Sequence, residues 1–340
     1  MNKKLSIFFT SVCLALALTA QAADWEPEEM PKDEAALIGF YQAGTESLAV
    51  REQQGNLQLL YRYLPKDKDF TKSNLFTLVK NHYDNYTLRE TGPNTDTEST
   101  IRFDRDKNGQ GISLVIGKNS YTRRFTAGEN GKPVRVTPAK SMAEFHQEAA
   151  QAAPPDKAYD KVADLVEVSS VVPGIHYDLR YTTDNNLFGT PLVESKQGLL
   201  DRSAAQALAR VQNRLKDYGY GLVLWEGYRS WADFKTATLA LGEQHTDMLP
   251  SAEEGFSHNT GRSVDVSLYD LETGEEASMP SDFDEPSPAQ YAHFAGGTEK
   301  QRALRDLLIR EMTLEGFTAS DMEWWHFDYD VDSAYKILNV

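Results

Sequence analysis

The sequence contains almost no cysteine: the only one among 340 residues is Cys13, close to the N-terminus. Cys13 lies inside an apolar segment that we expect to be removed from the mature protein. The mature chain would then have no disulfide bond, no thiol nucleophile and no thiolate ligand for a metal ion.

The sequence also lacks a long apolar run; its most apolar segment is a short one near the N-terminus. Asn2-Lys3-Lys4 is positive, Leu5 to Thr19 is mostly apolar, and Ala20-Gln21-Ala22 has the small-x-small form of a cleavage site. This order is typical of a secretory signal peptide, which we place at residues 1–23. The apolar part is too short for a membrane span, so none is expected after cleavage. An uncleaved anchor is the alternative; either way the protein would work outside the cytoplasm, in the periplasm or secreted.

Basic residues are scarce. The chain has 35 Lys and Arg against 51 Asp and Glu, and the loss of Lys3 and Lys4 with the signal peptide would move the net charge from −16 to −18. This balance argues against nucleic acid or an anionic membrane surface as a partner. It decides little about small substrates, because one arginine or a bound metal ion overrides a diffuse field locally.

The length predicts two domains, because 340 residues less a 23-residue signal peptide exceed one typical domain. Residues 24–140 predict a small, mostly β domain of unknown role, a sheet or a barrel, since short alternating or aromatic-rich runs alternate with glycine-containing turns. Residues 141–164, rich in alanine and containing Pro154-Pro155, predict a helix leading into a linker. Residues 165–340 form the second predicted domain. The short β runs of the first domain are residues 37–41, 57–61, 112–116 and 134–136.

The C-terminal domain alternates helix and strand signals. Asp201 to Tyr218 predicts a helix with Ser203 and Gln206 as a possible capping box, and Leu222 to Trp225 a short buried strand. Thr298 to Glu315 predicts a second helix, with Thr298 and Gln301 as its capping box. The order indicates an α+β fold, a mixed or antiparallel sheet with flanking helices that carries the functional site.

Four residues of this domain have the chemistry of a one-metal hydrolytic site: His258, Asp265, Glu323 and His326. Two imidazoles and one carboxylate are the ligands that Zn²⁺ prefers when a fourth position is left open for water. A second carboxylate, three residues before the last histidine, is placed to act as the general base for that water. The spacing predicts one Zn²⁺ per chain, bound by His258, Asp265 and His326.

Local patterns place these residues. Asp265 alternates with apolar Val264 and Val266, which predicts the polar face of a half-buried strand. Glu323 and His326 are three residues apart and would point to opposite faces of a regular strand, so we expect a turn or bulge between them. Taken singly, each residue has an ordinary alternative as a loop, strand or surface group, but these alternatives do not explain both spacings in one domain.

Arg229 follows the predicted buried strand, in the segment Trp225-Glu226-Gly227-Tyr228-Arg229. A guanidinium at that exit is suited to holding a carboxylate or a developing oxyanion. The alternative is a surface ion pair, which would be preferred if this segment stood alone.

Several segments together resemble the zinc D-alanyl-D-alanine dipeptidases of the vancomycin-resistance type. The resemblance covers about residues 166–327 and implies that His258, Asp265 and His326 bind zinc, that Glu323 is the base and that Arg229 stabilises the tetrahedral intermediate. One departure is Ser230, where the family commonly has proline. The segments are Asp178-Leu179-Arg180-Tyr181, Asn186-Leu187-Phe188-Gly189, Gly219-Tyr220-Gly221-Leu222, Gly227-Tyr228-Arg229, Ser257-His258-x6-Asp265 and Glu323-Trp324-Trp325-His326.

The same resemblance implies how the amine end of a dipeptide is bound. Asp284 falls at the position of the family's ammonium-binding aspartate, and Tyr181 matches a tyrosine near that end of the pocket. An anionic aspartate against a free ammonium favours a short substrate. The sequence thus predicts a dipeptidase that cleaves D-Ala-D-Ala or similar short dipeptides derived from the cell wall.

Two other functions stay open. The first is a zinc D,D-carboxypeptidase or endopeptidase that trims larger peptidoglycan peptides, for which an open groove would replace a pocket closed by Asp284. The second is a non-catalytic wall-binding protein with a structural zinc, against which an intact Glu323 beside an open coordination position argues. The sequence does not indicate the oligomeric state.

Overall fold

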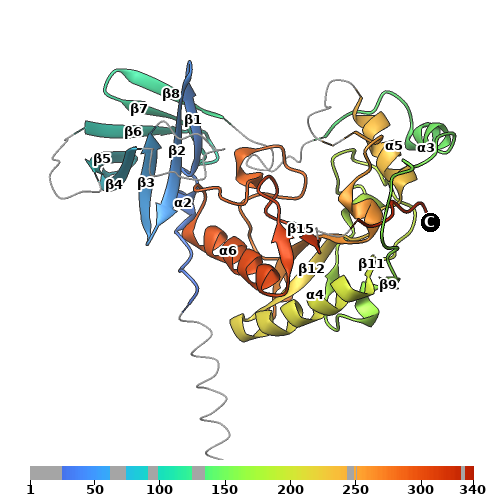
Figure 1. Cartoon of the computed structure of the whole chain (residues 1–340). Coiled ribbons are helices and arrows are strands. Elements are labelled where there is room, and N and C mark those ends of the chain that lie inside the picture. Colours follow the sequence, from blue (N-terminus) through green and yellow to red (C-terminus); the bar gives the residue numbers. More distant parts are fainter. Residues whose placement is uncertain are drawn as a thin grey trace, which may run out of the picture.

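The computed structural model describes residues 25–61, 74–90, 99–124, 135–242, 249, 251–330 and 334–340. The predicted signal peptide lies outside these residues. The chain forms a β-barrel and, beside it, an α+β unit with a central sheet (Figure 1). The α+β class and the β-rich N-terminal half are as predicted, while the exact domain boundaries stay a prediction.

The N-terminal half is a closed barrel of eight antiparallel strands in sequence order, β1-β2-β3-β4-β5-β6-β7-β8. It closes where β1 pairs with β8, through Phe40 opposite Arg124 and Gln42 opposite Thr122. The short helix α2 (Lys32–Ala35) precedes it. The strands are β1 (Gly39–Ala43), β2 (Glu46–Gln53), β3 (Asn56–Tyr61), β4 (Asn74–His82), β5 (Asn85–Glu90), β6 (Ser99–Arg105), β7 (Gly111–Ile116) and β8 (Asn119–Arg124).

Apolar side chains at alternate strand positions fill the barrel. Leu57 and Leu59 of β3 and Ile101 and Phe103 of β6 are at most 3% exposed and belong to one apolar cluster. Side chains two residues apart share a face of a strand, so this spacing predicts an interior and an exterior. Of the four predicted β runs, three fall on β1, β3 and β7; the run 134–136 is not a strand at 135–136, and residue 134 lies outside the described residues.

The C-terminal half is built on a five-stranded sheet in the order β10-β12-β13-β15-β14. β10 (His176–Tyr177) runs parallel to β12 (Tyr220–Glu226). The other neighbours are antiparallel: β12 with β13 (Ser263–Asp270), β13 with β15 (His326–Tyr329), and β15 with β14 (Phe317–Ala319). A separate two-stranded sheet joins β9 (Leu165–Glu167) and β11 (Leu199–Asp201).

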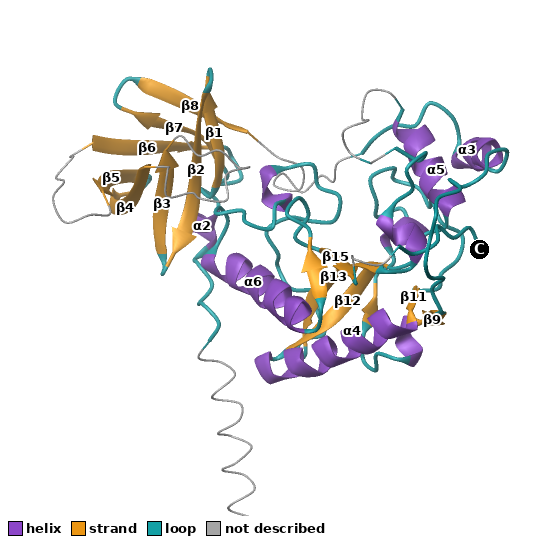
Figure 2. Cartoon of the chain, viewed as in Figure 1, coloured by secondary structure: helices purple, strands orange, loops and turns teal. Residues whose placement is uncertain are grey.

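Two amphipathic helices, α4 (Arg202–Leu215) and α6 (Glu299–Leu314), contact each other and the main sheet (Figure 2). The apolar face of α6 (Leu304, Leu307, Leu308 and Met312) is buried, and Thr298 and Gln301 form its predicted capping box. The capping box expected at Ser203 and Gln206 was wrong: the N-cap is Asp201, whose side chain accepts from the Ser203 N–H at 3.0 Å.

Shorter elements complete this half. α3 (Met142–Ala149) begins the predicted helix-to-linker segment and packs against α5 (Trp231–Leu241). Ser230 is the N-cap of α5: its Oγ accepts from the Asp233 N–H at 3.1 Å, which explains a hydroxyl side chain where proline is common. The described residues form 3₁₀ turns at Val168–Ser170, Arg180–Thr182, Lys216–Tyr218, Ser257–Thr260 and Pro288–Gln290.

Strand β13 departs from its expected environment. All its residues except the last are buried, so both faces are covered and the prediction of a half-buried strand was wrong. The alternation of Val264 and Val266 with Ser263, Asp265 and Ser267 instead separates an apolar core face from a polar face that is also covered. Burying a polar face beneath other parts of the protein costs free energy unless its groups are hydrogen-bonded or ion-paired. The buried polar face of β13 therefore indicates where the functional site lies.

The barrel docks on the α+β unit through strand β2. The backbone N–H of Glu52 donates to Gly297 O at 3.0 Å, and the carboxylate of Glu52 accepts from the Glu299 N–H at 2.6 Å, at the start of α6. Arg302 of α6 donates to Glu52 O at 2.7 Å. Beside these bonds, Phe40 packs on Phe294, with ring centroids 5.6 Å apart. A cavity of about 440 Å³ remains in this interface.

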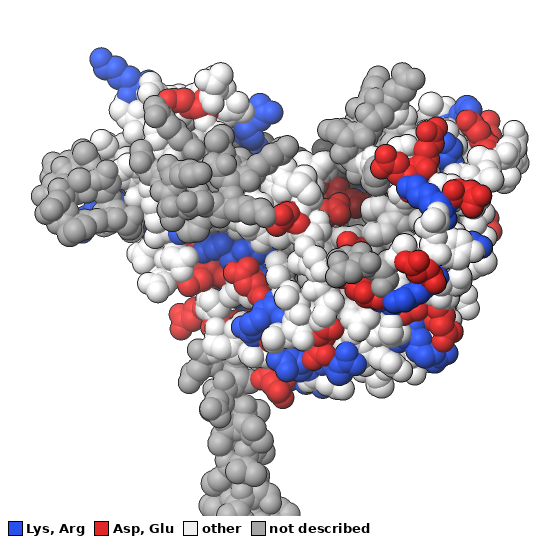
Figure 3. Space-filling model, viewed as in Figure 1, with Lys and Arg blue, Asp and Glu red and all other residues white. Residues whose placement is uncertain are grey.

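Charges of both signs are interspersed on the face that carries α4 and α6 (Figure 3). Arg210 of α4, whose side chain is largely exposed, pairs with Glu315 at 2.6 Å. Pairs of this kind contribute little to stability because water screens them. Among the described residues, no helix has both the length and the apolar character needed to cross a membrane.

Candidate active site

Three strands place acidic and imidazole side chains in one row. Glu226, next to a bulge in β12, pairs with Asp265 of β13, and Asp265 pairs with His326 at the start of β15. His258 reaches the same place from the turn Ser257–Thr260. Gly261 ends this turn in the left-handed conformation, with φ 71°, which lets the chain reverse into β13.

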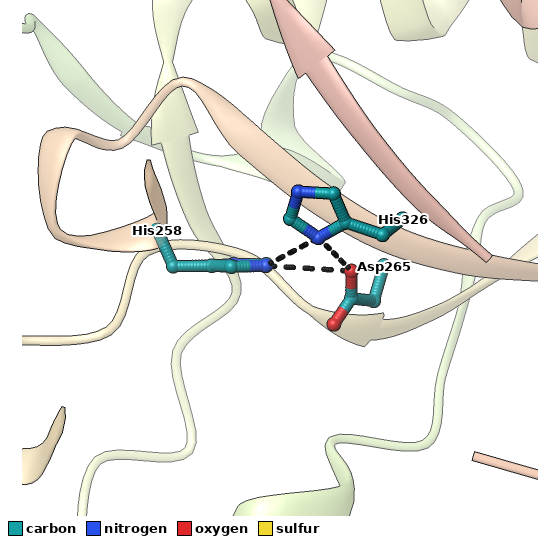
Figure 4. Close-up of side chains that lie close together, drawn as sticks. All are labelled: His258, Asp265 and His326. Carbon is teal, nitrogen blue, oxygen red and sulfur yellow. Dashed lines mark hydrogen bonds and ion pairs between the residues drawn. The ribbon is translucent and has the colours of Figure 1, made fainter. Parts of the chain in front are cut away.

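His258, Asp265 and His326 point toward one another (Figure 4). Asp265 Oδ1 lies 2.9 Å from His326 Nδ1 and 3.3 Å from His258 Nε2, and the two ring nitrogens are 3.2 Å apart. One ligand atom from each residue lies within 4.8 Å of the others, and all three residues are buried. The sequence-predicted ligands are therefore brought together.

The far sides of both imidazoles are hydrogen-bonded, which fixes the rings. His258 Nδ1 lies 2.7 Å from Gly227 O, so it donates and leaves Nε2 free to ligate. His326 Nε2 lies 3.2 Å from Asp328 Oδ1, and Asp328 also accepts from Ser263 Oγ. Metal-bound histidines are typically oriented by such partners. The donor set and its orientation therefore fit a divalent metal ion such as Zn²⁺.

The protonation of the cluster follows from its crowding. Burial disfavours the charged forms, but the imidazoles of His258 and His326 hold the pKa of Asp265 below its usual range. The pKa values of His258 and His326 are raised by this carboxylate in spite of burial. The buried negative charge of Asp265 stabilises the protonated forms of both imidazoles. The same charge would stabilise a metal cation bound among the three side chains.

Glu323 lies just before a turn at Trp324-Trp325, where the irregularity was expected. The His326 N–H donates to Glu323 O at 3.2 Å, and β15 begins only at His326. Burial raises the pKa of Glu323, and the negative charge of Asp265 raises it further. The turn thus brings both Glu323 and His326 to the site, which a continuous strand would not do.

Arg229 is buried, with a 2% exposed side chain, and Glu226 is its ionic partner at 2.9 Å. Its guanidinium carbon lies 4.7 Å from the Tyr181 ring centroid and 5.4 Å from that of Phe256. Glu226 keeps the pKa of Arg229 above its usual range although burial lowers it. Within the described part of the chain, Nη1 of Arg229 has no hydrogen-bond partner. A buried donor without a partner is available to a substrate oxygen.

Tyr181 and Asp284 are also brought together. The Tyr181 hydroxyl donates to Asp284 Oδ2 at 2.5 Å. Burial, and then the charge of Glu323, raises the pKa of Asp284 to about 8. Asp284 has a positive φ of 52°, which is uncommon for a residue other than glycine and indicates a constrained turn.

Two carboxylates serve the site that the sequence patterns did not predict, Glu226 beside Arg229 and Asp328 beside His326. The sequence does carry a signal for each, an acid at the end of an apolar strand and an acid two residues after a ligand histidine. What it does not show is the strand register that places Glu226 opposite Asp265.

Comparison with known proteins places this half of the chain among peptidases. The profile of the D-ala-D-ala dipeptidase family, peptidase M15, matches residues 161–337. A D-alanyl-D-alanine dipeptidase of Enterococcus faecalis is 30% identical over 188 residues, 49% of this chain and 92% of that protein. Proteins of the same name from Streptomyces coelicolor and Escherichia coli are 30% and 27% identical, over 48% and 52% of this chain and 90% and 89% of their own lengths.

The profile match, residues 161–337, covers most of the α+β unit and leaves the barrel strands outside. It includes the segments that carry His258, Asp265, Glu323 and His326. The family is metal-dependent, and the cluster of His258, Asp265 and His326 is a place where a metal ion could be held. The chain is therefore a metallopeptidase and belongs to the D-ala-D-ala dipeptidase family, peptidase M15.

Proposed function

We propose that this protein is a zinc-dependent dipeptidase that hydrolyses D-Ala-D-Ala or similar short dipeptides derived from the cell wall. The observation that carries the proposal is the convergence of three ligand atoms within 4.8 Å, beside an ionisable Glu323 and an Arg229 whose buried Nη1 has no hydrogen-bond partner among the described residues. Zn²⁺ bound by His258, Asp265 and His326 would act as a Lewis acid that polarises the peptide carbonyl and makes water more acidic.

In the proposed reaction a water oxygen bonds to the carbonyl carbon, and the peptide C–N bond breaks. Glu323 takes the proton from the attacking water and passes it to the nitrogen of the leaving amine. Its raised pKa suits both steps, because a carboxylate with a pKa closer to neutrality accepts and returns a proton more evenly.

Arg229 would stabilise the negative charge that develops on the carbonyl oxygen. Glu226 holds its Nε side, and the ring faces of Tyr181 and Phe256 flank the guanidinium. These contacts leave Nη1 to donate to the reacting oxygen without reorganisation at the moment of reaction. The contact strengthens as charge develops, so it lowers the barrier to reaction more than it tightens binding.

Asp284 would bind the free ammonium of the dipeptide, with Tyr181 fixing its second oxygen. The pKa of Asp284, about 8 when no ammonium is bound, falls when an ammonium lies beside the carboxylate, so binding ionises it. An acid in this position favours a substrate that begins at that amine. It therefore supports a dipeptidase over a carboxypeptidase or endopeptidase of longer wall peptides, which stays the alternative function.

The cellular setting is part of the proposal. A cleaved signal peptide at residues 1–23 would deliver the enzyme to the periplasm or the medium, where dipeptides released from the wall occur.

Product analysis tests the function directly. Zinc-loaded enzyme should release D-Ala from D-Ala-D-Ala and should cleave N-acetyl-D-Ala-D-Ala and a wall pentapeptide far more poorly, because capping removes the ammonium and leaves Asp284 unpaired. His258→Ala should lose both zinc and turnover. Comparable kcat/KM for the free and acetylated dipeptides would refute the dipeptidase function and favour the carboxypeptidase alternative.

A further inference from the structure

Two consecutive residues of another segment, Arg180 and Tyr181, contact the turn that carries Asp284. Arg180 Nη1 lies 2.9 Å from Asp282 Oδ1, and the next residue, Tyr181, donates to Asp284 Oδ2 at 2.5 Å. Tyr181 meets the proposed ammonium-binding carboxylate directly, while Arg180 holds the chain two residues before it. The turn is therefore contacted at two places, at the side chain of Asp284 and at Asp282, two residues before it.

Arg180 is itself firmly held. Its side chain is 6% exposed, and its guanidinium carbon lies 4.8 Å from the Trp225 ring centroid. Besides Asp282 it faces two more carboxylates, Asp178 at 2.7 Å and Glu276 at 3.7 Å. Three acids around one guanidinium already satisfy its charge, so Arg180 does not serve as a binding group for a substrate carboxylate.

Asp282 transmits this support into the turn. Its Oδ1 also accepts from the Phe283 N–H at 2.8 Å, and its backbone N–H donates to Glu285 Oε2 at 3.2 Å. Phe283 packs between Tyr181 and Trp225, with centroid distances of 5.5 and 5.6 Å. These contacts enclose Asp284, whose positive φ persists only where the surroundings impose it.

We propose that Arg180 and Asp282 form a clamp that positions Asp284 and thereby determines the preference for a substrate with a free amine. Both are positioning residues and neither touches the substrate. The inference rests on the proposed role of Asp284 and adds what holds that carboxylate in place. A misplacement of about 1 Å at such a group is enough to weaken a charge-assisted contact severely.

The test compares three amide variants with two substrates. Asp282→Asn removes the charge that Arg180 holds but keeps an oxygen for the Phe283 N–H. Asp178→Asn is the matched control, because it removes a carboxylate from the same guanidinium but lies outside the turn. Asp284→Asn reports whether Asp284 binds the ammonium at all. Each is assayed with D-Ala-D-Ala and with N-acetyl-D-Ala-D-Ala, and its bound zinc is measured.

Asp282→Asn should raise KM for the free dipeptide about 3- to 5-fold, a modest change because the Asp282 side chain is 51% exposed. Its kcat should stay within about 2-fold, and kcat/KM for the acetylated dipeptide should not change, because that substrate has no charge for Asp284 to meet. Asp282→Glu, which keeps the charge, should recover most of the loss. Asp178→Asn should change kcat/KM by no more than about 2-fold for either substrate.

Two failures are distinguishable. If Asp284→Asn leaves the ratio of kcat/KM for the free dipeptide to kcat/KM for the acetylated dipeptide unchanged, the proposed role of Asp284 is wrong. The clamp is refuted, while the proposed function stands, if Asp284→Asn lowers that ratio but Asp282→Asn does not. Asp282→Asn would then behave like Asp178→Asn or lower kcat/KM equally for both substrates.

Discussion

Arg229 and Glu226 form a buried ion pair at the end of strand β12, with Arg229 Nε 2.9 Å from Glu226 Oε1. Both side chains are less than 10% exposed. Glu226 also pairs in register with Asp265, so the same carboxylate lies behind the proposed metal site and beside the proposed oxyanion group. The ion pair therefore connects the proposed metal site to the proposed oxyanion-stabilising arginine.

Removing one partner of this pair should destabilise the fold. Glu226→Gln leaves Arg229 buried without its counter-charge, which typically costs about 3–5 kcal/mol. Urea unfolding of the zinc-loaded protein measures the loss. The double variant Glu226→Gln with Arg229→Met removes both charges and should recover part of it; a double variant that is no more stable than Glu226→Gln would show that the pair is not the cause.

Arg229→Ala should lower kcat more than it raises KM. One donor to a developing oxyanion contributes on the order of 10²–10³ in kcat. Steady-state kinetics with D-Ala-D-Ala separate the two parameters, and Arg210→Ala, which removes an exposed arginine of α4, is the control. An effect on KM alone would make Arg229 a binder of the substrate carboxylate instead.

Glu323→Gln should keep the zinc and lose most of the turnover. The amide is nearly isosteric but is a poor base, and loss of proton transfer costs about 10²–10⁴ in rate. Metal analysis and kcat are measured on the same preparation. Asp321→Asn, an exposed acid two residues away, should remain active. Near-normal kcat in Glu323→Gln with zinc bound would place the base elsewhere.

Asp328→Asn should weaken metal binding and leave the three ligands in place. Asp328 Oδ1 lies 3.2 Å from the outer nitrogen of His326, and loss of such a partner typically costs 10- to 100-fold in metal affinity. Competition with a chelator of known affinity gives the value. An unchanged affinity would mean that Asp328 does not orient His326.

The raised pKa of Asp284 gives a pH dependence with a definite sign. The folded protein binds this proton up to about pH 8, whereas an unfolded aspartate loses it near pH 4. The stabilisation from this proton is therefore complete below about pH 4 and is lost as the pH rises to about 8. Asp284→Asn has no proton to lose.

The melting temperature of Asp284→Asn relative to wild type should therefore rise between pH 5 and pH 8. Each 1 kcal/mol of this difference corresponds to a gain of about 2–4 °C in a domain of 150–250 residues. Differential scanning calorimetry of the zinc-loaded proteins at both pH values measures it. Parallel melting temperatures would show that Asp284 is ionised in the folded protein throughout.

The sequence predicted the features that depend on neighbouring residues. The capping box at Thr298 and the turn between Glu323 and His326 are local, because side-chain reach and strand alternation decide them. Closure of the barrel joins β1 to β8, more than 70 residues apart, and no local pattern encodes that pairing. The contact of Arg229 with its flanking ring Phe256 depends in the same way on packing between distant segments.

The capping error at α4 has a specific cause. Ser203 and Gln206 have the right residue types, but Asp201 is held by the Arg262 guanidinium at 2.6 Å and begins the helix two residues earlier. An acid at the N-terminus of a helix is favoured by the helix dipole, and here a tertiary ion pair adds to that preference. Sequence alone does not show which of two nearby capping residues, Asp201 or Ser203, has such a partner.

Docking of the barrel has a consequence for how this enzyme can be divided. Glu52 supplies a hydrogen-bond acceptor to the first turn of α6, and the outer face of the barrel covers the apolar side chains of Phe294 and Ala295. A fragment that begins at residue 141 would lose that acceptor and expose that surface to water. Although this fragment contains the whole length matched by the dipeptidase family, it should be less soluble and more readily digested by proteases than the intact chain. Heterologous expression of the catalytic half should therefore yield more soluble protein when the barrel is present, in the same polypeptide or as a separate chain.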